Sequence, residues 1–219
     1  MINKLLDLIN TSYSLQKNDI QEYSHIKVRP MTFVVENYTA KGLGNITVMK
    51  GTALFGIMKM DTLVINPFEI DMPLYSYDRI HVFKNDTLYQ ECYDTLLDES
   101  KRNNIDQSLH SISNKYNITS NIKKDPAWYD DILFPSSIFK KTKSESNTFD
   151  QFVLEYLSKY LELCKDAEQC DVPTKKTRAN QYTEGLLKHG GPSTDVFIKN
   201  KGKEFTEKFF YEVFFKTRR

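Results

Sequence analysis

The stretch "MPLYSYDRIHVF", residues 72–83, places an acidic residue on what should be an apolar strand face. A proline opens a run of aromatic and β-branched residues, which predicts a strand, and side chains alternate between the two faces of a strand. Asp78 therefore shares its face with Leu74, Ile80 and Val82. A carboxylate there costs free energy unless it is paired, hydrogen-bonded or protonated, and loss of water raises its pKa. Asp78 is thus a candidate general acid for work near neutral pH.

The same pattern also has an interpretation without chemistry. The strand end can be exposed to solvent, or Asp78 can pair with Arg79 or with a lysine. Either arrangement stabilises the ionised carboxylate and leaves no acid to donate a proton. From spacing alone, both interpretations stay open.

Residue patterns for other chemistries do not occur. The sequence contains no GxSxG, Walker A, HExxH or GxGxxG motif. The histidines at positions 25, 81, 110 and 189 lack the spacing of metal ligands. The cysteines at positions 92, 164 and 170 form no CxxC and are odd in number, which argues against a zinc site, an iron–sulfur cluster and a disulfide framework. These features predict no metal site and a reducing compartment.

The composition predicts a folded, soluble protein. The chain has 219 residues, 40% of them hydrophobic, with 30 basic and 29 acidic side chains. No electrostatic footprint for nucleic acid or for an anionic membrane appears in these totals, although an excess on one face can hide inside a balanced sum. The N-terminus has too short an apolar run for a signal peptide, and no stretch is long enough to cross a bilayer. We therefore expect no nucleic-acid partner and no membrane partner.

The order of elements predicts an α+β fold. A short amphipathic helix at the N-terminus is followed by segments rich in β-branched and aromatic residues, up to about residue 96. Short connections, including "NDT" at 85–87 as a hairpin turn, imply an antiparallel sheet. Helical patterns then occur at 99–116, 149–164 and 202–215, whereas "HGGPSTD" at 189–195 is expected to be a flexible loop. We treat residues 1–219 as one domain, with helices packed on the sheet.

Six segments, in the same order, resemble those of the ferredoxin-dependent bilin reductases. "PLYSYD" (73–78) is similar to the proline-led strand that delivers an aspartate into the bilin pocket of that family, and "TLVINP" (62–67) to the strand before it. Red chlorophyll catabolite reductase is a distant relative of that family and has the same fold. The resemblance covers residues 46–97 and 126–215. Its other segments are "KNDTLYQECYDT" (84–95), "WYDDILFPSSIFKKT" (128–142), "FDQFVLEYLSKYLELCKD" (149–166) and "YTEGLL…GKEFTEKFFYEVFF" (182–215).

The resemblance implies a fold, a site and a reaction. The fold is a three-layer α/β/α sandwich with a central antiparallel sheet. A linear tetrapyrrole, biliverdin or a dihydrobiliverdin, lies between the sheet and the C-terminal helices, and Asp78 donates a proton to it. Lys141 occupies the position of a propionate-binding arginine, so that the charge is kept but the bidentate geometry is lost. Ferredoxin, an external partner, supplies the electrons one at a time, and the protein binds no cofactor of its own. The resemblance implies a protein of the cytoplasm or the plastid stroma.

Several positions depart from the family pattern. The second acid of many members, before the penultimate helix, corresponds to Gly191, and Asp195 or His189 are candidates to replace it. Asp61 or Thr62, and Lys50, stand where one branch has a histidine and a glutamate. Several alternatives therefore stay open. The protein can catalyse a single two-electron reduction, or act on a different tetrapyrrole, including one derived from chlorophyll. It can also be a non-catalytic carrier or sensor, or an interaction domain that binds no pigment. The second-tier candidates for the pocket or a proton relay are Asp61, Asp71, His189 and Asp195.

Overall fold

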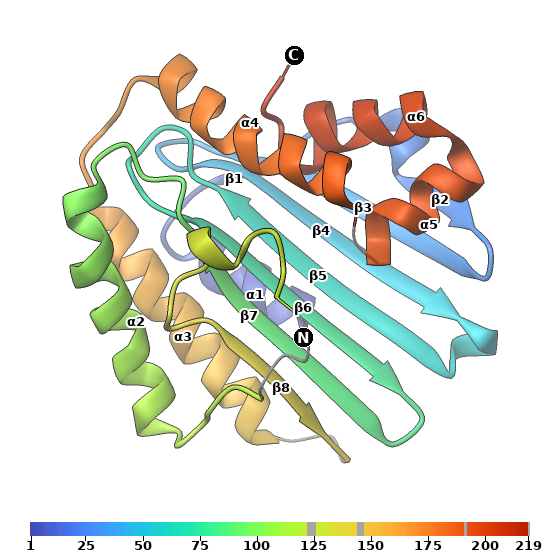
Figure 1. Cartoon of the computed structure of the whole chain (residues 1–219), viewed down its shortest axis with the longest axis horizontal. Helices are drawn as coiled ribbons and strands as arrows, with labels where there is room; N and C mark the ends of the chain where they lie inside the picture. Colours follow the sequence, from blue (N-terminus) through green and yellow to red (C-terminus); the bar gives the residue numbers. More distant parts are fainter. Residues whose placement is uncertain (122–125, 144–146, 191, 219) are drawn as a thin grey trace.

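A single sheet of eight strands forms the middle of the molecule, and helices cover both of its faces (Figure 1). The structure is a computed structural model, and it describes all residues except 122–125, 144–146, 191 and 219. Every strand pair in the sheet is antiparallel, in the order β1-β3-β4-β5-β6-β7-β8, with β2 also paired to β3. The strands are β1 (Leu15–Lys17), β2 (His25–Val28), β3 (Met31–Ala40), β4 (Gly44–Ala53), β5 (Met58–Asn66), β6 (Leu74–Val82), β7 (Asn85–Tyr93) and β8 (Ile138–Thr142).

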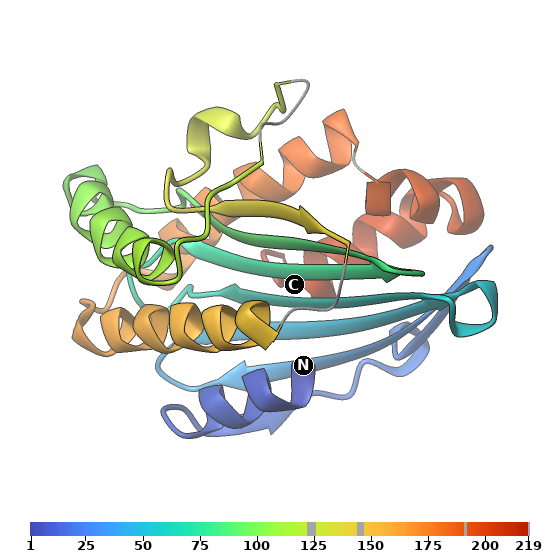
Figure 2. The ribbon, with the colours of Figure 1, turned by 90° about the horizontal axis from the view of Figure 1, so that it is seen from below.

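The helices form two layers around the sheet (Figure 2). One layer contains α1 (Ile2–Asn10) and α3 (Asn147–Asp166), with α2 (Arg102–Lys115) packed beside α3. The other contains α4 (Val172–His189), α5 (Pro192–Lys201), α6 (Lys203–Lys208) and the π-helical turn η5 (Phe209–Phe214). The α+β sandwich with a central antiparallel sheet is therefore confirmed. No helix in the described part of the chain is long and apolar enough to cross a membrane.

The two faces of the sheet carry two separate hydrophobic cores, and β6 contributes to both. Its tyrosines Tyr75 and Tyr77 are fully buried toward α3, where the ring of Tyr75 lies 5.1 Å from that of Tyr160. Its alternate residues face the C-terminal helices, whose core is built around Phe209, Phe210 and Phe214. The predicted apolar stripe of the helix at 149–164 packs into the first core.

Two local expectations were wrong. The turn between β6 and β7 lies at Phe83–Lys84 and not at 85–87, because Asp86 is fully buried in β7 by an ion pair of 2.6 Å with Arg79. The segment 189–195 is not a loop throughout: α4 continues to His189 and α5 begins at Pro192. Proline suits the first position of a helix, since the missing N–H has no partner there in any case.

Candidate active site

A cleft opens between the sheet and the C-terminal helices, on the face of β6 that carries Asp78. Its volume is about 220 Å³, and its mouth is open to solvent. Alternate residues of β4 to β7 form the floor, and α4, the start of α5 and η5 form the roof. Apolar side chains such as Met60, Ile80, Leu186 and Phe210 make up most of the lining. The polar groups of the floor are Thr62, Ser76, Asp78 and Glu91.

The Asp78 carboxylate accepts hydrogen bonds from two hydroxyl groups, one on the neighbouring strand β5 and one on its own strand β6. It lies directly opposite Thr62 of β5, whose hydroxyl donates a hydrogen bond to one carboxylate oxygen. The hydroxyl of Ser76, two residues earlier on the same face, donates to the other oxygen over 3.3 Å. Burial nevertheless dominates and raises the pKa of Asp78 to about 6, although both hydrogen bonds favour the charged form.

Arg79 does not neutralise Asp78. Its side chain lies on the other face of the sheet, where the guanidinium pairs with Asp86 and with Asp150 of α3. Among the described residues, no lysine or arginine forms an ion pair with Asp78. The interpretation in which Arg79 pairs with Asp78 is therefore wrong, because alternation along the strand sends the two side chains to opposite faces.

Glu91 is a second carboxyl group in the cleft, and the sequence analysis did not single it out. It lies directly opposite Ser76, so that Asp78 and Glu91 are diagonal neighbours on adjacent strands. The Glu91 side chain is only 5% exposed and accepts a hydrogen bond of 2.6 Å from the hydroxyl of Tyr93. The sequence shows that Glu91 shares a strand face with Tyr89 and Tyr93, but only the register between β6 and β7 places Glu91 beside Asp78.

Aromatic side chains form the wall of the cleft beside Glu91. The ring of Tyr93 lies 4.5 Å from that of Tyr182 on α4 and 5.5 Å from that of Tyr129. Trp128 packs against α4 at Gly185, where a Cβ would come within 2.3 Å of the indole ring. A glycine is required at that point for this close approach. Burial raises the pKa values of these tyrosines, that of Tyr129 to about 12, so their hydroxyls stay protonated near neutral pH.

Three expected site residues lie at the margin of the cleft. Lys141 is exposed on β8, on the same sheet face as Asp78, with its ammonium group 5.3 Å from the centre of the Phe139 ring. His189 ends α4 and stacks on Trp128, with ring centres 5.7 Å apart. Asp195 is exposed and lies against Gly190, which lines the cleft. Gly191 is outside the described residues.

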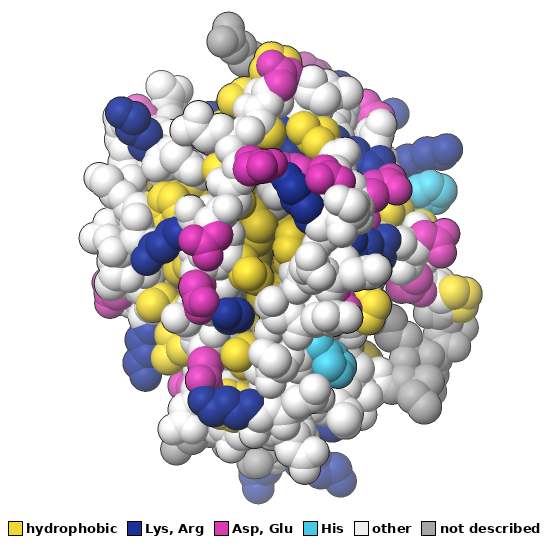
Figure 3. Space-filling view, turned by 90° about the vertical axis from the view of Figure 1, so that its left-hand side faces the viewer, with side chains coloured by type: hydrophobic (Ala, Val, Ile, Leu, Met, Phe, Trp, Pro, Cys, Tyr) yellow, Lys and Arg dark blue, Asp and Glu magenta, His cyan; other side chains and the backbone are white. Residues whose placement is uncertain are grey.

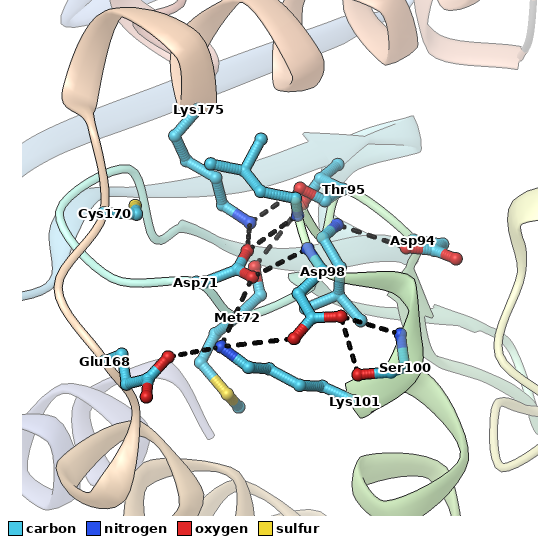
Figure 4. A network of polar contacts seen from close by, with 12 residues as sticks. Asp71, Met72, Asp94, Thr95, Asp98, Ser100, Lys101, Glu168, Cys170 and Lys175 are labelled. Carbon is cyan, nitrogen blue, oxygen red and sulfur yellow. Dashed lines mark hydrogen bonds and ion pairs between the residues drawn. The ribbon is translucent and has the colours of Figure 1, made fainter.

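Three other expected residues lie away from the cleft. Asp61 is on the opposite face of the sheet, 3.9 Å from the N-terminal ammonium group. Lys50 also points to that face and donates to Asn3 over 3.2 Å. Asp71 is buried in a network with Lys175 at the other end of the strands (Figure 4). The described residues contain no group of three His, Cys, Asp or Glu side chains that could hold a metal ion.

Comparison with known proteins identifies the fold. No protein-family model matches the sequence, and no curated protein matches it. Among solved structures, the chain is similar to phytochromobilin synthase from tomato, whose crystal structure was determined in complex with biliverdin. The TM-score is 0.71 at 14% sequence identity, and the match covers 99% of this chain and 82% of the tomato protein. At this identity the two proteins share a fold, which is the fold that the six sequence segments implied.

Proposed function

We propose that this chain is a reductase of a linear tetrapyrrole, biliverdin or a dihydrobiliverdin, with ferredoxin as electron donor and Asp78 as proton donor. The observation that carries the proposal is the cleft with a carboxyl group of raised pKa on an apolar floor. The similarity in fold to the tomato phytochromobilin synthase, which was crystallised with biliverdin, supports the proposed substrate class. Reduction of one double bond consumes two electrons and two protons. Ferredoxin supplies the electrons singly, and the protein supplies the protons.

The environment of Asp78 suits protonation of a reduced pigment. Addition of an electron makes the tetrapyrrole more basic, and an acid with a pKa of about 6 is then matched to the transfer. The hydroxyls of Thr62 and Ser76 stabilise the carboxylate that remains after the proton has left. Solvent then returns the proton through the open mouth of the cleft.

Glu91 is the second proton donor in this proposal. It takes the role of the acid that the sequence lacks at Gly191, from a different strand. The Tyr93 hydroxyl holds its carboxyl group in place at 2.6 Å, and the aromatic wall around Tyr182 keeps bulk water away. Lys141, on the cleft face of β8, would bind a propionate carboxylate at the rim.

Two measurements test the proposal in sequence. Titration with biliverdin should shift the pigment's absorption bands at micromolar protein, and no shift would remove the pigment from the proposal. Anaerobic mixing with reduced ferredoxin should then bleach or shift the bound pigment with multiple turnovers. Binding without turnover would instead identify a carrier or sensor.

Asp78→Asn is the decisive variant. It should keep biliverdin affinity and lower turnover by about 10²-fold or more, which is the usual contribution of a general acid. Asp7→Asn, an exposed change on α1, is the matched control. Full turnover in Asp78→Asn would show that Asp78 is not the donor.

A further inference from the structure

Three hairpins turn at the same end of the sheet, at the right of Figure 1. The register fixes this arrangement, because Met31 lies opposite Ala53, and Met58 opposite Val82. We call the residues 29–30, 54–57 and 83–84 the hairpin tips. They join β2 to β3, β4 to β5 and β6 to β7.

The hairpin tips expose large apolar side chains to water. Phe55 is fully exposed, at 110% of its reference area, and Phe83 is 67% exposed. Leu54 and Ile57, on either side of the Phe55–Gly56 pair, are 48% and 43% exposed. Isolated exposed apolar residues are ordinary, but four of them gathered at one end of a molecule indicate an interaction surface.

The backbone at these residues adds a second cost. Leu54, Phe55 and Phe83 have φ angles of 52°, 56° and 56°, in the left-handed region. Glycine and asparagine are the residues that hairpin turns usually place there. Bulky apolar residues at these positions therefore gain neither backbone stability nor burial in the isolated chain. The gain must come from something outside it.

The charge of the three hairpins has one sign. The stretches 26–35, 46–60 and 79–85 contain no aspartate or glutamate. Among their basic residues, four are exposed near the turns: Lys27, Arg29, Lys59 and Lys84. The balanced total charge of the chain conceals this local excess.

We propose that the hairpin tips dock on an anionic lipid surface. Phe55 and Phe83 would insert at the level of the headgroups, and the four basic side chains would contact lipid phosphates and carboxylates. Lipid fits better than a protein partner, because the apolar side chains stand on separate neighbouring turns. Hairpins two strands apart are about 10 Å apart, so their tips form a row that matches a plane. This inference is independent of the proposed reductase activity.

Flotation with lipid vesicles tests the proposal. The full chain should float with phosphatidylcholine vesicles that contain phosphatidylserine at about 30 mol%, and less with phosphatidylcholine alone. Salt should weaken the association by screening. The double variant Phe55→Asn, Phe83→Asn should lose at least about tenfold in affinity. Its thermal midpoint should not fall, because asparagine tolerates the left-handed backbone.

Two further variants separate the contributions. Lys59→Ser with Lys84→Ser should lower affinity for the anionic vesicles about tenfold and leave the weak association with neutral vesicles unchanged. Leu97→Asn with Val172→Asn removes exposed apolar residues at the other end of the molecule and should change nothing. Absence of flotation, or flotation that survives the double phenylalanine change, would overturn the proposal. The proposal would also be overturned if the chain did not bind vesicles but associated with itself, or bound ferredoxin, in a way that depends on Phe55 and Phe83.

Discussion

Two aspartates of this chain lose contact with water on folding, Asp71 almost completely and Asp78 in part, and their polar partners are of different kinds. Asp71, in the connection between β5 and β6, lies in a network with a buried lysine (Figure 4). Lys175 of α4 is fully buried, with its ammonium group 2.9 Å from Asp71 and 2.6 Å from the carbonyl of Thr95. The backbone N–H groups of Leu97 and Asp98 donate to Asp71 over 2.8 and 3.0 Å. Asp78 has two hydroxyl partners and, within the described part of the chain, no such cation.

The partners decide the direction of each pKa. Burial raises the pKa of Asp71, but the N–H of Leu97 and the Lys175 ammonium outweigh it, and the net pKa is below the ordinary value. Burial raises the pKa of Asp78 to about 6 because hydroxyls alone do not offset it. A buried carboxyl with a full set of donors is therefore a structural element, whereas one without a cation is a candidate for proton transfer. Asp71, expected as a pocket candidate, belongs to the first kind.

The wider surroundings of the two carboxyl groups also differ: those of Asp71 are charged, and those of Asp78 are mostly apolar. The connection between β5 and β6, which contains Asp71, lies at the left of Figure 1, and Figure 3 shows acidic and basic side chains interspersed on that side of the molecule. Lys101, at 31% exposed, bridges Asp71 and Glu168 there. Asp78 instead shares the cleft with Met60 and Ile80 of the floor and with Phe210 and Phe214 of the roof.

The largest expected effect comes from removal of the buried cation. Lys175→Met removes the buried ammonium partner of Asp71 and should lower the free energy of unfolding by about 3–5 kcal/mol at pH 7. Urea denaturation measures the change. The matched control is Lys101→Met, because that exposed cation also faces Asp71, over 3.8 Å, but should contribute about 0–1 kcal/mol. Equal losses in the two variants would contradict the structural role of Lys175.

The pH dependence of this loss has a defined sign. The pKa of Asp71 is lower in the folded than in the unfolded chain, so its contribution is present above the unfolded pKa and is lost as pH falls through the folded pKa. The difference between Lys175→Met and the unsubstituted chain should therefore shrink in acid.

Asp78→Asn should act in the opposite direction on stability. The pKa of Asp78 is higher in the folded chain, so its favourable contribution exists below the unfolded pKa and is lost as pH rises through about 6. Above that value the ionised carboxylate destabilises the fold, and asparagine should raise the free energy of unfolding by about 1–3 kcal/mol at pH 8. Near pH 4 the two chains should be equally stable. A variant that is less stable at pH 8 would show that the carboxylate is stabilised there.

Sequence reasoning predicted the strand face that Asp78 occupies, because alternation is a local property. The period of two along β6 fixes which face each side chain occupies, and the apolar neighbours on that face predict a buried site. The apolar stripe of α3 was found for the same reason, through its helical period.

The rest of the site depends on distant contacts. Glu91 lies beside Asp78 only because Ser76 is its partner in the register, and pairing between strands does not follow from either strand alone. Lys175 stands in "PTKKTRAN", where the sequence does not distinguish the buried lysine from the half-buried one at 176. The turn at Phe83–Lys84 was missed because its residues are unusual for a turn, while Asp86 is held in the strand by Arg79.

Glu91→Gln tests whether the cleft contains two acids or one. Glutamine keeps the size of the side chain and an acceptor for the Tyr93 hydroxyl but cannot supply a proton. We expect turnover to fall about tenfold, less than in Asp78→Asn, because water at the open mouth can substitute in part. Single-turnover absorption spectra should show an intermediate that carries the first proton only. Spectra and rates identical to those of the unsubstituted protein would leave Asp78 as the sole donor.

The smallest expected effect concerns Lys141, an exposed counterpart of the buried Lys175. An ammonium group in water contributes about 0–1 kcal/mol to an ion pair, so Lys141→Ser should weaken biliverdin binding by about threefold, and less at high salt. Lys141→Arg should bind at least as tightly as the unsubstituted protein, since a guanidinium contacts a carboxylate in bidentate fashion. Lys140 is the matched control, because alternation along β8 turns it to the other face of the sheet. If Lys140→Ser and Lys141→Ser weaken binding equally, the effect is one of net charge, and the propionate contact at the rim is excluded.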